Sequence, residues 1–453
     1  MKMRFSSYLA LAIVSLGLMR ETLAQAQTFS VLYEFGSKTG DPLNPWFPGT
    51  IAQGRDGNLY STTPQGGGVG RGAMFRITPK GTLSVLDSFD SAPLSGLTLG
   101  TDGNFYGTTS GGESAQLGTV FRITRGGTVT VLHNFAGPDG AYPTASPVEG
   151  TDGNFYGTTE EGGTNSLGTV YKITPSGKLT TLHSFFDNTH GEFPIAPLVQ
   201  GTDGNFYGTT FQEDGVVYKI SPSGKLTVLH HFNASQGAYI TAPLIQGSDG
   251  NFYGTTTGDG IIGGTVFKIT AAGKFTVLRK LHGVGEGPVL VAGLVQASDG
   301  NFYGTTTSGG TAQEGSLFRI SPKKPYPYKI LYSFDGTTGQ DPYVTLIQHT
   351  NGILYGDTDI GGIGGGVFYS LNVGLKPFVA LVSSSGKVGQ TIEILGQGFK
   401  GTTAVSFNGT AASFKVVSST YLTAKVPSGA TTGFVTVTTA KRNLRSSKKF
   451  RVL

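Results

Sequence analysis

Two pairs of neighbouring carboxylates stand where they could supply a general acid and a general base. Glu160 and Glu161 follow one Gly-Thr-Thr segment, and Glu213 and Asp214 lie shortly after another. Glycosidase chemistry needs two carboxyl groups about 5–10 Å apart on either side of the scissile bond. These four residues are the candidates for acid/base chemistry, and the sequence leaves open whether catalysis occurs at all.

Four aromatic residues lie ten residues before the Asp of the recurring Asp-Gly-Asn turn and suit a binding surface. They are Trp46, Tyr142, Phe193 and Tyr239. Aromatic rings stack on sugar rings or hold a partner's side chains, because they offer rigid contact area. The alternative is that they fill gaps between repeated units of the fold.

The chain ends in a cluster of basic residues. They are Lys441, Arg442, Arg445, Lys448, Lys449 and Arg451. One interpretation is a solvated basic edge. The other is attraction to an anionic surface, such as an acidic polysaccharide or a layer of lipid headgroups. Nucleic acid is not expected as a partner if the protein is exported.

We expect neither a metal site nor a cofactor. The chain has no cysteine, which removes disulfides, thiolate ligands and a cysteine nucleophile. No pair of its seven histidines has metal-site spacing. The Asp of the recurring Asp-Gly-Asn turn supplies one ligand per turn, whereas a calcium loop needs several.

An internal repeat positions these residues. The segment typified by Asp102-Gly-Asn-Phe-Tyr-Gly-Thr-Thr109 recurs with its Tyr at 60, 106, 156, 207, 253, 303 and 355, so the period is near 50 residues. Two further segments recur in step with it, one around Phe121 and one ending at Phe135. A period of this length is typical of propellers and solenoids.

Each repeat holds four short runs with β-strand character. In the fourth repeat we expect them at 198–200, 206–210, 216–221 and 225–232, joined by Asp-Gly-Asn and Pro-Ser-Gly turns that favour hairpins. Seven such units predict an all-β fold, a seven-bladed β-propeller over residues 27–374. The chain starts with a fourth-type run at 29–35 and the last repeat stops after a third-type run at 366–371. The N-terminal strand should therefore close the last blade.

This repeat resembles the GloVer-type tandem repeat of exported bacterial proteins. The resemblance lies in Asp-Gly-Asn-Phe-Tyr-Gly-Thr-Thr followed by Gly-Gly and Gly-Thr-Val-Phe-Lys-Ile-Thr, and it spans residues 28 to about 371. That family is defined by its repeat and implies no catalytic residues.

The final segment, residues 375–453, resembles an IPT/TIG immunoglobulin-like module. The matching segments include Ile392-Glu-Ile-Leu-Gly396, Val405-Ser-Phe407 and Gly433-Phe-Val-Thr-Val437. Short alternating strands with Gly turns predict a small β-sandwich by themselves.

The net charge of +5 hides two domains of opposite sign. Residues 27–376 carry 20 basic and 26 acidic side chains, giving −6, whereas residues 377–453 carry ten basic residues and one acid, giving +9. We expect the propeller face that holds the variable loops to be acidic. Those acids either solubilise the Gly-rich loops or attract cations and basic partners.

The N-terminus predicts export. Lys2 and Arg4 precede an apolar run at 8–19, and Ala24-Gln-Ala26 provides a small-x-small cleavage site, so residues 1–26 are expected to be a signal peptide. No later segment is long and apolar enough for an integral membrane span. We expect a secreted or periplasmic protein that is not a lipoprotein, since no cysteine is present.

These features favour a non-enzymatic binding or adhesion protein that presents a multivalent loop face to a carbohydrate or a cell-surface protein. The alternatives are a hydrolase or lyase acting on polysaccharide and a purely structural surface or matrix protein. The sequence indicates no oligomeric state.

Overall fold

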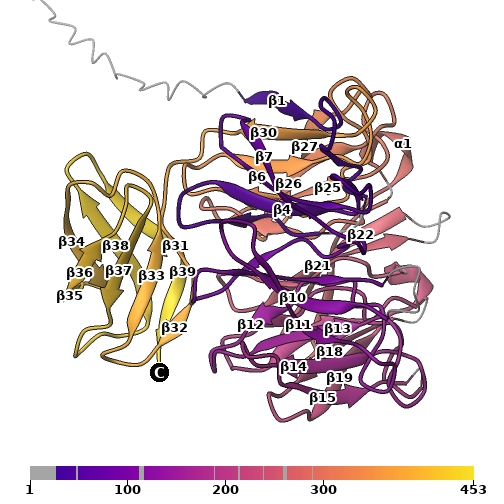
Figure 1. The fold of residues 1–453 in the computed structure, drawn as a ribbon, viewed down its shortest axis with the longest axis horizontal. Helices are drawn as coiled ribbons and strands as arrows, with labels where there is room; N and C mark the ends of the chain where they lie inside the picture. The colour runs from indigo at the N-terminus through magenta and orange to yellow at the C-terminus, as the bar shows by residue number, and fades with distance from the viewer. Residues whose placement is uncertain are drawn as a thin grey trace, which may run out of the picture.

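The computed structural model describes residues 27–46, 49–111, 117–187, 189–212, 215–237, 239–258, 263–287 and 289–453. Seven four-stranded antiparallel sheets form the blades of a propeller, and a β-sandwich stands beside it. Figure 1 shows the sandwich, in yellow, against one side of the propeller. The predicted all-β, seven-bladed fold is confirmed. The expected signal peptide lies outside the described residues.

The first three blades follow one strand order from the propeller axis outward. Blade 1 holds β3 (Ala52–Gln53), β4 (Leu59–Thr63), β6 (Ala73–Ile77) and β7 (Leu83–Ser88). Blade 2 holds β8 (Thr98–Leu99), β9 (Phe105–Thr109), β10 (Thr119–Ile123) and β11 (Val129–Asn134). Blade 3 holds β12 (Val148–Glu149), β13 (Phe155–Thr159), β14 (Thr169–Ile173) and β15 (Leu179–Ser184).

The next three blades repeat that order. Blade 4 holds β16 (Val199–Gln200), β17 (Phe206–Thr209), β18 (Val216–Ile220) and β19 (Leu226–His231). Blade 5 holds β20 (Ile245–Gln246), β21 (Phe252–Gly258), β22 (Gly263–Ile269) and β23 (Phe275–Lys280). Blade 6 holds β24 (Val295–Gln296), β25 (Phe302–Thr306), β26 (Ser316–Ile320) and β27 (Tyr328–Ser333). Loops contain η1 (Ala234–Gln236), α1 (Gly283–Glu286) and the pair β2 (Pro42–Leu43) and β5 (Gln65–Gly66).

The seventh blade joins the two ends of the propeller sequence. It holds β28 (Ile347–Gln348), β29 (Leu354–Asp357), β30 (Val367–Asn372) and the N-terminal β1 (Thr28–Glu34). Strand β1 pairs antiparallel with β30 from Thr28↔Asn372 to Glu34↔Val367. This closure gives the last blade the outer strand that its own repeat lacks and removes two exposed sheet edges.

The Asp-Gly-Asn motif and the tyrosine that follows it form a structural unit in the turns of blades 1 to 6. In blade 2 the carboxylate of Asp102 accepts hydrogen bonds from the backbone N–H and side-chain amide of Asn104 and from the hydroxyl of Tyr106 at 2.7–3.0 Å. The Tyr106 ring stacks on Phe155 of blade 3, with ring centroids 3.7 Å apart. Each motif therefore caps its own turn and packs one blade against the next.

The glycine after that tyrosine is required by close packing. A Cβ at Gly107 would lie 2.7 Å from the ring of Phe121 on the adjacent strand. The same contact in blade 7 joins Gly356 to Tyr369, whose hydroxyl would lie 2.5 Å from that Cβ. Tyr369 is thus the blade 7 counterpart of Phe121.

A glutamine side chain on the innermost strand is hydrogen-bonded to the preceding blade, a contact that we call the clasp. Its side-chain oxygen accepts a hydrogen bond from a backbone N–H beside the preceding blade's turn at 2.8–3.0 Å. The pairs are Gln200 with Thr151, Gln246 with Thr202, Gln296 with Ser248, Gln348 with Ser298 and Gln53 with Thr350. Glu149 holds Thr101 in the same way. Blade 2 has Leu99 at this position and makes no such bond.

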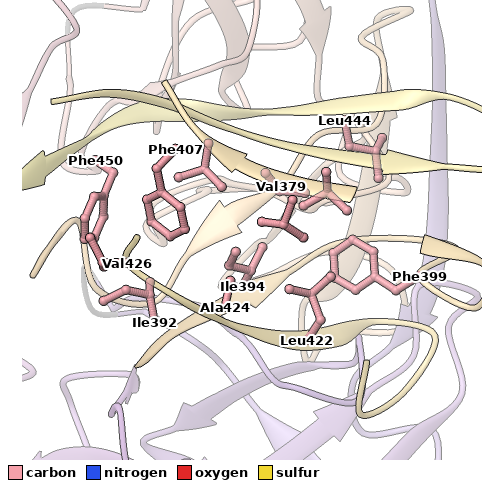
Figure 2. Close-up of a cluster of buried hydrophobic side chains, with 13 residues drawn as sticks. Val379, Ile392, Ile394, Phe399, Phe407, Leu422, Ala424, Val426, Leu444 and Phe450 are labelled. Atoms are coloured by element: carbon pink, nitrogen blue, oxygen red, sulfur yellow. The ribbon is translucent and has the colours of Figure 1, made fainter. Parts of the chain in front are cut away.

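The C-terminal domain is a two-sheet sandwich. One sheet holds β31 (Ala380–Leu381), β33 (Thr391–Leu395), β37 (Tyr421–Lys425) and β36 (Phe414–Val416). The other holds β32 (Ser385–Gly386), β39 (Asn443–Val452), β38 (Gly433–Thr439), β34 (Thr402–Phe407) and β35 (Thr410–Ala412). Figure 2 shows the core between them, in which Phe399, Phe407 and Phe450 are at most 1% exposed.

The sandwich covers the propeller face that carries the Asp-Gly-Asn turns, which we call the turn face. The Thr420 hydroxyl donates to the carbonyl of Arg55 at 2.8 Å, and the amide of Gln397 donates to Thr350 Oγ1 at 3.0 Å. The opposite face, called the loop face, carries the loops between second and third strands and between successive blades. The loop face is therefore the propeller face left open to a partner.

Candidate functional site

One position in each inter-blade loop stitches neighbouring blades together through its backbone. The N–H of Tyr142 donates to the Leu117 carbonyl of blade 2, and the Tyr142 carbonyl accepts from the N–H of Glu160. Tyr142, Phe193 and Tyr239 all adopt a positive φ of 53–56° at this position. Such a conformation is rare for bulky residues, so the two blade contacts must hold it in place. The backbone of these three residues therefore links neighbouring blades.

Trp46 does not share that position. In blade 1 the residue with positive φ is Asn44, whose N–H donates to the Gly365 carbonyl of blade 7 at 3.0 Å. The loop before β3 is longer than its counterparts, so counting ten residues back from Asp56 arrives at the wrong place. Trp46 is instead 41% exposed on the loop face.

A pocket of about 370 Å³ lies beside Trp46, where blade 7 meets blade 1. It is lined by Asn44, Trp46, Gln65, Asp359 and Ile360. The side-chain amide of Asn44 donates to the Asp359 carbonyl at 3.1 Å and ties the two blades together there. One exposed indole, two amides and a carboxylate thus share a single hollow.

Two further aspartates lie near Asp359, and the sequence placed all three only among the acids of the variable loops. The backbone N–H of Asp359 donates to the carbonyl of Asp341 at 3.1 Å. Asp357, two residues earlier, is fully buried, and neither of its carboxylate oxygens has a hydrogen-bond partner. Other blades place threonine at the Asp357 position, as in Thr108 and Thr305, so the signal in the sequence was a departure from the repeat.

Burial raises the pKa values of these three aspartates. Burial, assisted by the negative charge of Asp341, raises the pKa of Asp359 to about 6. Burial and then the charge of Asp359 raise the pKa of Asp357 well above its ordinary value. Burial and the charge of Glu314 also raise the pKa of Asp341. Perturbed carboxyl groups beside a pocket are typical of functional sites.

The predicted acid pairs have separate outcomes. Glu160 and Glu161 lie beside Tyr142, because their N–H groups donate to the carbonyls of Tyr142 and Ala141. Burial, and then the charge of Glu161, raises the pKa of Glu160. Glu213 and Asp214 lie outside the described residues.

The structure divides the C-terminal basic cluster. Lys441 and Arg442 are exposed in the β38–β39 hairpin. Arg445 lies over the ring of Phe434, with its guanidinium carbon 3.5 Å from the ring centroid. Lys448 and Arg451 face the propeller, where Arg451 donates to the carbonyl of Thr202.

The described residues contain no cluster of three or more side chains suited to a metal ion. Helices long and apolar enough to cross a membrane are likewise absent from the described part of the chain.

The solved structures similar to this chain are distant. A proposed 6-phosphogluconolactonase from Bacteroides uniformis is 15% identical, with a TM-score of 0.46 over 68% of this chain and 94% of its own. The PQQ-bound aldose sugar dehydrogenase from Streptomyces coelicolor is 13% identical, with a TM-score of 0.40 over 77% and 98%. Nothing about activity follows from likenesses this weak. A search of curated proteins finds no match.

Two family models match the sequence. An IPT/TIG domain matches residues 377–450, in agreement with the sandwich described above. The Gloeobacter/Verrucomicrobia repeat matches residues 17–146, 93–296 and 261–402, which together cover the whole propeller. The chain therefore belongs to the Gloeobacter/Verrucomicrobia repeat family and carries a C-terminal IPT/TIG domain.

Proposed function

We propose that this protein is an exported bacterial binding protein that holds a carbohydrate on the propeller's loop face without chemically altering it. The observation that carries the proposal is the pocket in which the exposed Trp46 stands beside Asn44, Gln65 and Asp359. An indole offers an apolar face for a sugar ring, while amides and a carboxylate bind its hydroxyl groups.

The distribution of exposed apolar side chains supports this choice of face. Trp46, Val69, Ile360 and Ile363 are 37–59% exposed, and all four belong to loops of blades 7 and 1 on the loop face. Tyr142 extends the set to another blade of the same face, with 37% exposure. Apolar residues rimmed by polar groups are typical of ligand and partner surfaces. Adhesion would arise from this surface through contacts at more than one blade.

A glycan array tests the proposal. The mature chain is expected to bind at least one neutral or acidic polysaccharide, and Trp46→Ala is expected to abolish that binding. Phe186→Ala is the matched control, because Phe186 is an equally exposed aromatic of the loop face that does not line the pocket. If Trp46→Ala and Phe186→Ala both keep full binding, the pocket is not the site. Retention of a protein but no glycan would identify a protein partner instead.

A second candidate function is cleavage of a polysaccharide, as a hydrolase or as a lyase. The observation that favours it is the raised pKa of Asp359, about 6, next to a second carboxylate at Asp341. A carboxyl group with such a pKa can give and take a proton near neutral pH. Release of reducing ends or unsaturated sugars by the wild type, lost in Asp359→Asn, would establish catalysis. Binding without any released product supports the non-enzymatic proposal.

A further inference from the structure

Four cavities lie between the propeller's turn face and the sandwich, with volumes of about 600, 510, 390 and 240 Å³. The 510 Å³ cavity lies along the propeller axis, where the innermost strands of several blades face Phe378 and Leu381. The three smaller cavities are all lined by Lys448. Ligand sites form preferentially where domains meet, and pockets of about 300–1,000 Å³ are usual for small molecules.

A bulge in β39 aims Lys448 at these cavities. Leu444, Ser446 and Phe450 are buried in the sandwich, so strict alternation would send Lys448 inward as well. Between the pairs Phe434↔Lys449 and Thr436↔Arg445, however, β39 advances four residues while β38 advances two. Bulges of this kind redirect a side chain. The accessible surface of Lys448 therefore opens into the space between the domains.

The cations of the 390 Å³ cavity lack ion-pair partners in the described part of the chain. Among the described residues, no carboxylate forms an ion pair with Lys448, Lys449 or Arg451, which all line this cavity. The carboxylates that line these cavities accept hydrogen bonds from groups other than these cations. Asp249 accepts hydrogen bonds from Asn251 and Tyr253, and Glu149 accepts two from Thr101.

A buried hydroxyl group in the same wall also lacks a partner. Ser385 is 5% exposed and lines the 390 Å³ cavity, and its Oγ makes no hydrogen bond. Burial of an unsatisfied hydroxyl is costly. The Ser385 Oγ has almost no accessible surface, so its side chain would have to rotate toward the cavity for a ligand oxygen to satisfy it. Thr151 and Thr432 add further hydroxyl groups to the lining.

We propose that this cavity binds a small, hydroxyl-rich anion whose negative group contacts Lys448 and whose hydroxyl groups meet Ser385 and the threonines. A sugar acid and a sugar phosphate share this chemistry. The site is separate from the Trp46 pocket, because the cavity lies at the turn face and Trp46 lies on the loop face. Its occupation would bridge the sandwich and the turns of blades 4 and 5.

Calorimetric titration of the full mature chain tests the proposal with glucuronate, glucose 6-phosphate and glucose as probes. At least one of the two anions should bind, and glucose should bind at least about tenfold more weakly, because a charge-assisted contact is lost. Lys448→Met should weaken anion binding about tenfold or more, whereas Lys441→Met, an exposed lysine outside the cavity, should leave it unchanged. Ser385→Ala should weaken it by a smaller factor.

Three results would overturn the proposal. One is equal anion affinity in Lys448→Met and Lys441→Met, each shown by circular dichroism to be folded. A second is binding of glucose as tight as that of the anions. The third is no binding of either anion at millimolar concentration. Glycan binding that depends on Trp46 is a separate readout, so failure here would leave the loop-face proposal standing.

Discussion

The guanidinium group of Arg55, in the first blade, forms a two-pronged ion pair with the carboxylate of Glu393 in the sandwich, at 2.5 and 3.1 Å. Glu393 is the only acid among the 77 residues 377–453. Arg55 lies in the turn of blade 1. The innermost strand of blade 2 has Leu99 at the position where the other blades have the glutamine or glutamate that binds the preceding blade's turn. The sandwich thus reinforces the blade junction at which the propeller's own clasp is missing.

Glu393→Gln should weaken the contact between the domains. The side chains of Arg55 and Glu393 are only 25% and 15% exposed, and the hydroxyl of Tyr421 donates to Glu393 at 2.9 Å. Losing the countercharge should lower the free energy of unfolding by about 1–3 kcal/mol. Differential scanning calorimetry measures this change.

The matched control for that prediction is Glu161→Gln, which neutralises an exposed acid without an ion pair in the described part of the chain. It should shift stability by no more than about 0.5 kcal/mol. In a double-mutant cycle with Arg55→Met, the Glu393→Gln cost should largely disappear. An undiminished cost would mean that Glu393 acts through some other contact.

Asp357→Thr should stabilise the propeller at neutral pH. Asp357 is buried without a hydrogen-bond partner, whereas Thr108 at the same position of blade 2 donates to the carbonyl of Pro143 at 2.9 Å. Removing an unsatisfied buried carboxyl group should raise the free energy of unfolding by about 1–3 kcal/mol. Thermal unfolding is the measurement, and a lower melting temperature would show that Asp357 makes a stabilising contact. Reduced ligand binding in the more stable variant would mark Asp357 as retained for function.

Stability should fall between about pH 4 and pH 6 because of Asp359. Its pKa is about 6 in the folded protein, above the ordinary value of 3.8, so the folded state holds this proton after the unfolded state has lost it. Stability then decreases as pH rises through that window. Comparing urea unfolding of the wild type and Asp359→Asn isolates this contribution from Asp341 and Glu160, which also titrate with raised pKa values. A difference between the two curves that does not change with pH would contradict the prediction.

The repeat made the propeller predictable from sequence. In the fourth repeat the expected strands at 198–200, 206–210, 216–221 and 225–232 coincide within one residue with β16, β17, β18 and β19. The closing strand at 29–35 became β1, Thr28–Glu34. Periodicity succeeds here because all seven blades have the tyrosine, while six of them share the Asp-Gly-Asn turn and six share the glycine after the tyrosine.

The candidate site was less predictable because it lies where the repeat breaks down. Trp46 follows a loop of different length, so Asn44 takes the position that sequence spacing assigned to Trp46. Asp357 replaces a threonine in the most degenerate repeat, where a departure from the motif looked like simple divergence. The direction of the Lys448 side chain depends on a bulge in β39 and on how the two domains pack together. The alternation of apolar and polar residues in the sequence predicts neither.

Trp46 is the only tryptophan, so the protein's intrinsic tryptophan fluorescence reports on the loop-face pocket alone. The most direct test of the central proposal is therefore a fluorescence titration with the glycan that scores highest on the array. We predict a saturable change in emission as a sugar ring covers the exposed indole, with weaker binding in Gln65→Ala and Asp359→Asn. A glycan that binds with no change in Trp46 emission, and with equal affinity in those variants, would contradict the proposal.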